Sequence, residues 1–385
     1  MPEFDFSQPL NRAATGALKW TRYAGRDVLP FWVADMDFRS PPAVIEALAA
    51  RADHGAYGYT EAPQRTVDTV LAYLHTRHEL AVEADWLVWL PGLVPALNTS
   101  ARAFAAAGES ILTATPVYPP FLSAPPWQGR TLQTGTIAWA GRRASLDWAS
   151  LDAAIDHTTR AFFFCNPHNP IGRAYTREEV ARVAEFCTAH DLALVSDEIH
   201  CDLLLNPGGT HVSALHLPHV QDRTVALFAA SKTYNLAGLA CAFAVIPNAR
   251  LRQRFIQAKR GMITEVNAFG YTATEAALRA GEPWRQALLA LLRTNLETLQ
   301  AFVATHCPAL RLMDVEATYL AWIDATALPV ENPTAHFESH GLGLSHGADF
   351  GAPGWLRWNF GCPPDMQEAG LARLKAGYAA AMATV

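Results

Sequence analysis

The sequence lacks the features that mark several classes of protein. Its 385 residues carry a formal net charge of −6 at pH 7 and only 17% charged residues, so we expect no nucleic acid or anionic membrane as a partner. No apolar run approaches the length of a membrane span. Residues 1–6 show no basic region followed by an apolar stretch, so we expect no secretory signal and a cytoplasmic protein.

Cysteine is sparse and unpaired. No two of the six cysteines have Cys-x-x-Cys spacing, so we expect reduced, mostly buried thiols. They are Cys165, Cys187, Cys201, Cys241, Cys307 and Cys362. His211, His216 and His219 are loosely spaced in a loop-like stretch and are interpreted as solvated. We therefore expect no metal site.

A chain of 385 residues can bury a large core and suggests two domains, and half of its residues are hydrophobic, as in a globular protein. Strand-like runs alternate with amphipathic helical runs in the middle of the chain, so the sequence predicts an α/β fold with a mostly parallel, seven-stranded sheet covered by helices on both faces. The expected strands are 86–90, 110–114, 131–134, 161–165, 192–195, 224–229 and 240–246. One of the expected helices spans 177–190, after the possible cap Thr176.

The last third of the chain has a different pattern. A long helix is expected over 282–305, followed by strands at 319–323 and 355–360 and a closing helix from about Asp365. We expect a large domain over 45–282. A smaller α+β domain would combine 1–44, including an N-terminal arm, with 283–385 and close over the site.

Lys232 is the residue that most clearly suggests chemistry. Apolar segments, 225–230 and 236–246, flank it on both sides. Burial lowers the pKa of a lysine and makes its amine a nucleophile for carbonyl carbons, as in a Schiff base. The alternative is a surface lysine at a strand end with a solvated tip.

Two further polar residues follow strand-like runs and could serve such a lysine. Asp197 follows the run 192–195, and the carboxyl ends of parallel strands are where ligand groups collect. Its carboxylate could keep the pyridine nitrogen of pyridoxal 5′-phosphate (PLP) protonated, or it could cap a helix. Asn169 lies in a turn with two X-Pro steps and a glycine, which would present its amide rigidly to the phenolic oxygen of that cofactor. A plain Asn-Pro turn is the alternative.

Together these runs resemble the fold-type I PLP enzymes, the aspartate aminotransferase superfamily, and most closely its MalY/PatB-type cystathionine beta-lyase (C-S lyase) branch. Nine segments carry the resemblance in the expected order and span nearly the whole chain. They are 29–38, 55–60, 91–97, 115–121, 166–172, 196–200, 231–233, 317–322 and 356–363.

The resemblance implies roles for further residues around PLP. The catalytic residues would be Lys232, Asp197 and Tyr118, with the Tyr118 ring stacked on the pyridine face; a core tyrosine is the alternative. The phosphate would bind the amides of Gly92, Leu93 and Val94 at a helix N-terminus, together with Ser231, although an ordinary strand-to-helix turn has the same spacing. His200 would tune the phenolic oxygen.

Tyr59 resembles a tyrosine that reaches the phosphate of the neighbouring subunit, which implies a homodimer with shared sites. Otherwise Tyr59 is a loop tyrosine. Arg357 interrupts an apolar strand, where a guanidinium could bind a substrate carboxylate or point to solvent. By resemblance, Tyr319 and the backbone of Ala34 and Asp35 would line the same substrate pocket.

The sequence departs from typical aminotransferases of the superfamily at three positions. Ala240 stands where they carry a phosphate-binding arginine, and Ala229 where they often carry a hydroxyl. His200 replaces a tyrosine, as in the C-S lyase branch. Ser231 and the amides near Gly92 are therefore expected to carry more of the phosphate binding.

We therefore expect PLP-dependent beta-elimination on a sulfur-containing L-amino acid, L-cystathionine or a cysteine S-conjugate, which gives thiol, pyruvate and ammonia. The resemblance places such a lyase in amino-acid metabolism, as in methionine biosynthesis. The alternative enzyme is a class I/II aminotransferase, which shares the first half of the reaction. A regulatory protein that binds PLP and acts through a protein partner is the alternative from another class. Retention of Lys232, Asp197, Asn169 and Arg357 argues against it.

Overall fold

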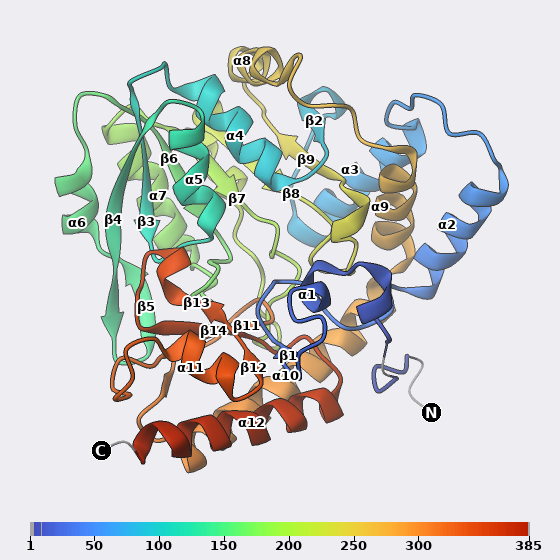
Figure 1. Cartoon of the computed structure of the whole chain (residues 1–385). Helices are drawn as coiled ribbons and strands as arrows, with labels where there is room; N and C mark the ends of the chain where they lie inside the picture. The colour runs from blue at the N-terminus through green and yellow to red at the C-terminus, as the bar shows by residue number, and fades with distance from the viewer. Residues whose placement is uncertain (1–3, 9, 384–385) are drawn as a thin grey trace.

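The computed structural model describes residues 4–8 and 10–383. A large sheet forms the upper part of the molecule in Figure 1, and a smaller sheet lies below it. The order of the large sheet is β2 (Leu87–Leu90), β9 (Ala242–Val245), β8 (Thr224–Phe228), β7 (Ala193–Asp197), β6 (Thr159–Cys165), β3 (Ser110–Thr115), β4 (Thr131–Ala140) and β5 (Arg143–Leu146).

The centre of the large sheet is parallel and apolar on both faces. β4, β3, β6, β7 and β8 run parallel in turn, whereas β9, β2 and β5 pair antiparallel. Side chains alternate between faces along β6, so Phe163 packs into one core while Phe162 and Phe164 pack into another. Strands buried on both sides need helices on both sides, which explains their continuous apolar runs.

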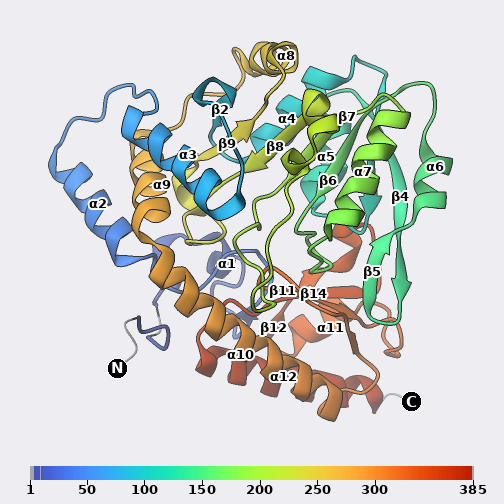
Figure 2. The same cartoon turned by 180° about the vertical axis from the view of Figure 1, so that it is seen from behind.

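Helices cover both faces of this sheet (Figures 1 and 2). The core that contains Phe163 also takes side chains from α4 (Leu93–Phe104), α5 (Pro119–Trp127) and α8 (Ala249–Lys259). The opposite face packs against α6 (Trp148–Ala154), α7 (Arg177–Ala189) and α3 (Gln64–His78). Thr176 caps α7 through a reciprocal pair of hydrogen bonds with Glu179, as its place in the sequence predicts.

The sheet has eight strands, and the prediction of seven is wrong by one. The third expected strand continues to Ala140, turns at Gly141 and returns as β5. Gly141 has a φ of 62°, which glycine adopts without strain, and this lets the chain reverse within two residues. The return strand is only four residues long and polar at alternate positions, so no apolar run marks it in the sequence.

The smaller sheet has the order β10 (Arg311–Leu312), β11 (Leu320–Asp324), β14 (Trp355–Asn359) and β13 (Ser345–His346), and all its pairs are antiparallel. Near it lie α10 (Glu282–His306), α11 (Pro333–Ser339) and α12 (Pro364–Met382). The expected long helix and closing helix are thus confirmed. Among the described residues, no helix is long and apolar enough to cross a membrane.

The N-terminal segment is tied to the smaller sheet's side of the molecule. It contains α1 (Leu18–Thr21), and β1 (Leu29–Pro30) pairs in parallel with β12 (Leu342–Gly343). Next, α2 (Pro42–Asp53) packs on α9 (Ala268–Ala280) beside the large sheet. The domain bounds of 45–282, and of 1–44 with 283–385, stay a prediction.

Candidate active site

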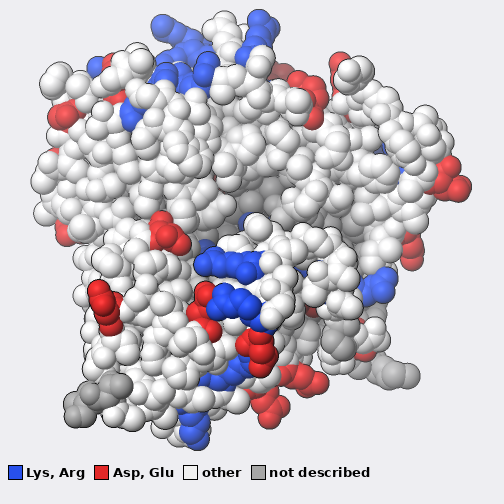
Figure 3. Space-filling view, viewed as in Figure 1, with Lys and Arg blue, Asp and Glu red and all other residues white. Residues whose placement is uncertain are grey.

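The carboxyl ends of three neighbouring strands meet at one cavity of about 350 Å³. β6, β7 and β8 end there, and the loops that follow them carry the polar residues singled out in the sequence. The face shown in Figure 1 is hollowed at its centre (Figure 3). The cavity is lined by Val33, Ala34, Pro91, Gly92, Leu93, Val94, Pro95, Tyr118, Cys165, Asn169, Asp197, Ile199, His200, Ser231, Lys232, Ala237 and Arg357.

The Lys232 amine points to the loop that follows β1. Its Nζ donates a hydrogen bond of 2.7 Å to the carbonyl oxygen of Ala34. Loss of water around the amine lowers the pKa of Lys232 to about 8, and the positive charge of Arg357 contributes to this shift. About a tenth of the amine is therefore neutral, and so nucleophilic, at pH 7.

Asp197 lies at the end of β7 and is buried. One carboxylate oxygen accepts a 3.1 Å hydrogen bond from the backbone N–H of Ile199. Burial raises the pKa of Asp197 to about 7, helped by the nearby charge of Glu198 and opposed by Lys232. A buried carboxyl with this environment is suited to a cationic ring nitrogen, because a positive partner would restore its charged form.

His200 and Tyr118 are held uncharged on the cavity wall. Burial lowers the pKa of His200 to about 3, so its imidazole is neutral at physiological pH. Its Nδ1 atom has no hydrogen-bond partner among the described residues, which leaves it available to a ligand. Burial also raises the pKa of the Tyr118 hydroxyl, which stays protonated.

Arg357, in the middle of β14, is held by three acceptors. It donates to Asn169 Oδ1 at 2.8 Å, to the carbonyl oxygen of Trp32 at 2.8 Å and to Ser345 Oγ at 3.1 Å. Its guanidinium lies over the ring of Phe350 at 4.6 Å. Burial lowers the pKa of Arg357 to about 10, so it remains cationic at neutral pH. Its buried Nε–H has no acceptor within the described chain, so a carboxylate could bind there.

The N-terminus of α4 opens onto the same cavity. Gly92 precedes the helix with a φ of 136° and has no side chain to cap it, while Gly92, Leu93 and Val94 all line the cavity. Uncapped N–H groups at a helix start bind anions. Ser231 lines the cavity too, whereas the only cations among its described lining residues are Lys232 and Arg357.

Most of the predicted site residues thus lie together, but three lie outside the lining. Tyr319 is buried behind the wall, with its ring 6.1 Å from that of His200. Asp35 forms an ion pair with Arg12 at 2.6 Å. Tyr59 is fully exposed and lines a separate hollow of about 940 Å³ with residues 263–269.

Sequence reasoning missed the partners of the expected residues. Ser345 and Phe350 hold Arg357, and Cys165 lines the cavity although it was interpreted only as a buried thiol. The one available signal was Arg357 itself, because a charged residue in an apolar strand needs partners. All six cysteines are free and buried, as expected.

The prediction of solvated histidines is wrong for two of the three. His211 is buried and its Nε2 lies 2.8 Å from a Glu198 carboxylate oxygen, while His216 contacts the carbonyl oxygen of His78 at 2.6 Å. Their loop buries His211 against Glu198, just after β7, and leaves His216 half-buried against the end of α3. Only His219 is exposed.

One group of potential metal ligands occurs among the described residues. Side-chain atoms of His78, Cys201 and Asp202 lie within 4.8 Å of one another, and all three residues are buried. The Tyr73 hydroxyl donates to Asp202 at 2.9 Å, and Arg77 lies 3.5 Å from the same carboxylate. Because hydrogen bonds and an arginine already compensate Asp202, we interpret this group as a buried polar network.

Comparisons with known proteins agree over nearly the whole chain. The model of the aminotransferase class I and II family matches residues 26–374. Cystathionine beta-lyase PatB of Bacillus subtilis (strain 168) is 34% identical over 384 residues, which cover 97% of this chain and 99% of PatB. The crystal structure of OvoB has a TM-score of 0.95 and 39% identity, covering 97% of this chain and 99% of that one. The PLP-bound C-S lyase from Staphylococcus hominis has a TM-score of 0.91 and 27% identity, with 97% and 98% covered.

Proposed function

Because this chain belongs to the aminotransferase class I and II family, among the fold-type I PLP enzymes, we propose that it is a carbon–sulfur lyase. Its substrates would be L-amino acids with sulfur on the β-carbon, such as L-cystathionine or cysteine S-conjugates. One observation carries the proposal: a nucleophilic lysine, a buried carboxyl and a partly unpaired arginine line a single cavity, as Lys232, Asp197 and Arg357.

The cavity fits PLP in the chemistry of its donors. The uncapped start of α4, at Gly92 to Val94, and Ser231 would hold the phosphate, and Asp197 would pair with the pyridine nitrogen. Asn169 uses its Oδ1 for Arg357, so its amide N–H groups are left for the phenolic oxygen, next to His200. Tyr118 would stack on the ring. When bound, PLP supplies an electron sink that stabilises negative charge at the substrate Cα.

The residues of this chain would then carry out the remaining tasks. Arg357 would bind the α-carboxylate through its unpaired Nε–H and orient the Cα hydrogen toward the Lys232 amine. Lys232, neutral above its lowered pKa of about 8, would remove that proton as a general base. The β-carbon–sulfur bond breaks as the thiolate leaves. The released aminoacrylate takes up water to give pyruvate and ammonia.

Several features favour elimination over transamination. PatB, at 34% identity, is a cystathionine beta-lyase, and the S. hominis relative is a C-S lyase. A good leaving group on the β-carbon makes its expulsion faster than return of the proton to the cofactor. Substrate and pocket therefore decide the outcome together.

The test supplies L-cystathionine to the purified enzyme without any 2-oxo acid and follows pyruvate and thiol. We expect many turnovers, and none in Lys232→Ala. A transaminase would stop after one half-reaction and resume only when a 2-oxo acid was added. That result would replace the proposed lyase by the aminotransferase alternative.

We also propose that the active unit is a homodimer in the cytoplasm. Exposed Tyr57 and Tyr59 border the hollow they form with residues 263–269, and a second copy of the chain would cover it. Six buried free cysteines suit a reducing compartment.

A further inference from the structure

The segment 32–38, which we name the active-site loop, touches both reactive cations. Lys232 donates to the carbonyl oxygen of Ala34 at 2.7 Å, and Arg357 donates to that of Trp32 at 2.8 Å. These carbonyls lie two residues apart in the sequence. The amine that would take the Cα proton and the guanidinium that would bind the carboxylate are therefore both hydrogen-bonded to the same short loop, which fixes their relative position.

Asn359 holds this loop from the β14 side. Its Nδ2 donates to the carbonyl oxygen of Val33 at 2.6 Å and to that of Asp35 at 2.9 Å. Its Oδ1 accepts from the backbone N–H of Gly361 at 2.8 Å. Asn359 is completely buried and lies two residues after Arg357, so both side chains face the loop from one strand.

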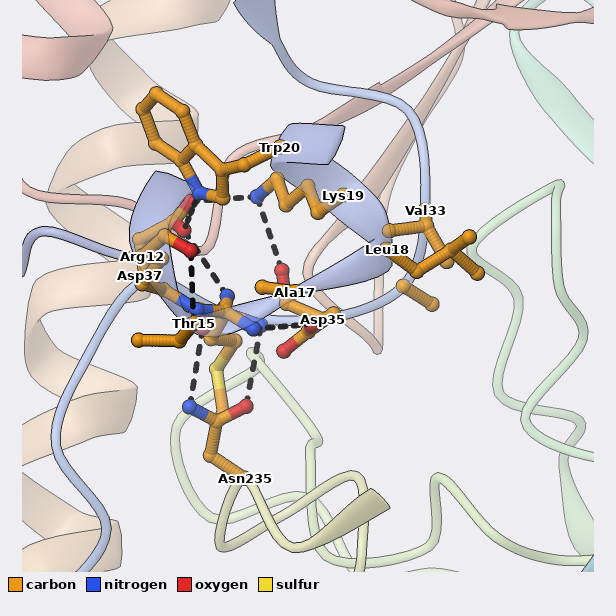
Figure 4. Close-up of polar contacts among 12 residues, drawn as sticks. Arg12, Thr15, Ala17, Leu18, Lys19, Trp20, Val33, Asp35, Asp37 and Asn235 are labelled. Atoms are coloured by element: carbon orange, nitrogen blue, oxygen red, sulfur yellow. Dashed lines mark hydrogen bonds and ion pairs between the residues drawn. The ribbon is translucent and has the colours of Figure 1, made fainter. Parts of the chain in front are cut away.

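Asn235 holds the loop from the Lys232 side. Its Nδ2 donates to the carbonyl oxygens of Met36 at 3.0 Å and Phe38 at 2.8 Å, and its Oδ1 accepts from the backbone N–H of Met36 at 3.2 Å. Figure 4 shows this amide beneath the loop. Asn235 has a φ of 59°, which asparagine tolerates better than most residues.

The N-terminal arm closes the third side (Figure 4). Lys19 is completely buried, and its Nζ donates to Asp37 Oδ2 at 2.6 Å and to the carbonyl oxygen of Asp35 at 2.9 Å. Arg12 donates to the carbonyl oxygen of Met36 at 2.9 Å and pairs with both acids of the loop. The carbonyl oxygens of 32–36 and 38 thus accept side-chain hydrogen bonds from outside the loop.

A loop held in this way cannot shift without leaving buried carbonyls unpaired, which costs more than an ordinary hydrogen bond. We propose that Asn235 and Asn359 are positioning residues, which fix the active-site loop so that the Lys232 amine and the Arg357 guanidinium stay in register for a bound amino acid. The catalytic part of this inference rests on the proposed function. Whether the two asparagines fix the loop can be measured independently of the proposed function.

The test uses Asn235→Gly, Asn359→Ala and the double variant. Glycine at 235 keeps the positive φ while it removes the side chain. Asn295→Ala is the matched control, because Asn295 is buried like Asn359 and its Nδ2 donates at 2.9 Å to the carbonyl oxygens of Phe360 and Cys362, outside the loop.

The first measurement is amide hydrogen exchange of residues 32–38 in the purified holoenzymes. We expect each single variant to speed exchange there by roughly tenfold or more, and Asn295→Ala to leave it within about twofold. The second is kcat/KM for L-cystathionine per folded protein. Each variant should lose about tenfold or more, with a raised KM. The double variant should lose little beyond the worse single one, because both act through one loop.

Unchanged loop exchange in both single variants would overturn the inference whatever the activity. Losses that simply multiply in the double variant, or that Asn295→Ala reproduces in full, would also overturn it. If Asn359→Ala does not fold, half-buried Asn235→Gly carries the test alone through exchange and the KM change. Faster exchange in an enzyme inactive on every sulfur amino acid would contradict the proposed lyase function and leave the holding of the loop established.

Discussion

Asp197 shows how burial of one side chain links the site to pH. The pKa of its carboxyl is raised from 3.8 to about 7, so the folded protein binds this proton more tightly than the unfolded chain does. Its contribution to stability is complete below pH 3.8 and is lost as the pH rises through 7. The cost of charging this buried group is thus present at neutral pH unless a cation pairs with it.

The corresponding prediction compares the cofactor-free wild type with Asp197→Asn, which cannot ionise. We expect the free energy of unfolding of the wild type, relative to the variant, to fall by a few kcal/mol between about pH 4 and pH 7. Urea unfolding at intervals across this range measures it. A constant difference between the two proteins would show that the carboxyl is not forced toward its neutral form.

Arg357 is the second residue whose environment makes a definite prediction. Asn169, Ser345 and the carbonyl oxygen of Trp32 bind the two terminal nitrogens of its planar fork, and its Nε has no partner among the described residues. A lysine keeps the charge but cannot reproduce that fork. Arg357→Lys should therefore raise KM by about ten- to a hundredfold, on the scale of one or two charge-assisted hydrogen bonds.

Steady-state kinetics with L-cystathionine measure this change. Arg26→Lys is the control, because Arg26 pairs with Glu338 at 2.8 Å on the surface, where an exchange of cations costs little. An unchanged KM in Arg357→Lys would mean that the substrate carboxylate is bound elsewhere.

The turn at 166–172 is the element that places Asn169. Gly172 has a φ of 69°, and a Cβ added there would lie 3.0 Å from Val315 Cγ1 and 3.2 Å from Val315 Cα. The backbone of the neighbouring segment leaves no room for it. An alanine would therefore carry both backbone strain and a collision that pushes the turn away from the cavity.

We expect Gly172→Ala to lower the melting temperature and to weaken PLP binding, measured by titration of the cofactor-free protein. Gly141→Ala provides the comparison, because Gly141 has a similar φ of 62° but no neighbour within 4 Å of the added Cβ. It should lose stability through strain alone and bind PLP normally. Equal PLP affinity in the two variants would mean that the turn that carries Asn169 does not contribute to cofactor binding.

At the level of elements, apolar runs in the sequence predicted the strands of the large sheet that contain such a run. The strands β2, β3, β6, β7, β8 and β9 lie within a residue or two of their expected positions. All of these except the edge strand β2 are buried on both faces, which requires continuous apolar residues. The hairpin strand β5 has no such run and was missed. It is a strand only because the turn at Gly141 brings it against the edge of β4, and this contact is not visible in the sequence pattern.

The same division applies to the site. The family, the fold and the PLP cofactor predicted from nine ordered segments are confirmed by the comparisons. The partners of these segments could not be predicted. Asn235 lies 197 residues from its partner in the loop, and Ser345 and Asn359 lie 313 and 326 residues from theirs. Only the folded chain brings them together. No local pattern marks such residues, because an isolated asparagine or serine has many ordinary uses.

The whole molecule supplies the last prediction, which concerns Tyr59. It is fully exposed and takes no part in lining the cavity of its own chain, although its segment resembles one that reaches the phosphate of a neighbouring subunit. If the sites are shared, a subunit with Tyr59→Ala and one with Lys232→Ala are each inactive alone but complement each other. Their hybrid has one site with both native residues.

Equal amounts of the two variants should therefore regain activity when their subunits exchange, up to about a quarter of the wild-type value for random pairing. Subunit exchange in mild urea followed by the pyruvate assay measures it, and each variant treated alone is the control. Because the regained activity needs two chains at one site, it should disappear when the mixture is kept from exchanging. A fully active monomer in analytical ultracentrifugation would contradict the shared site and leave Tyr59 as a surface residue of its loop.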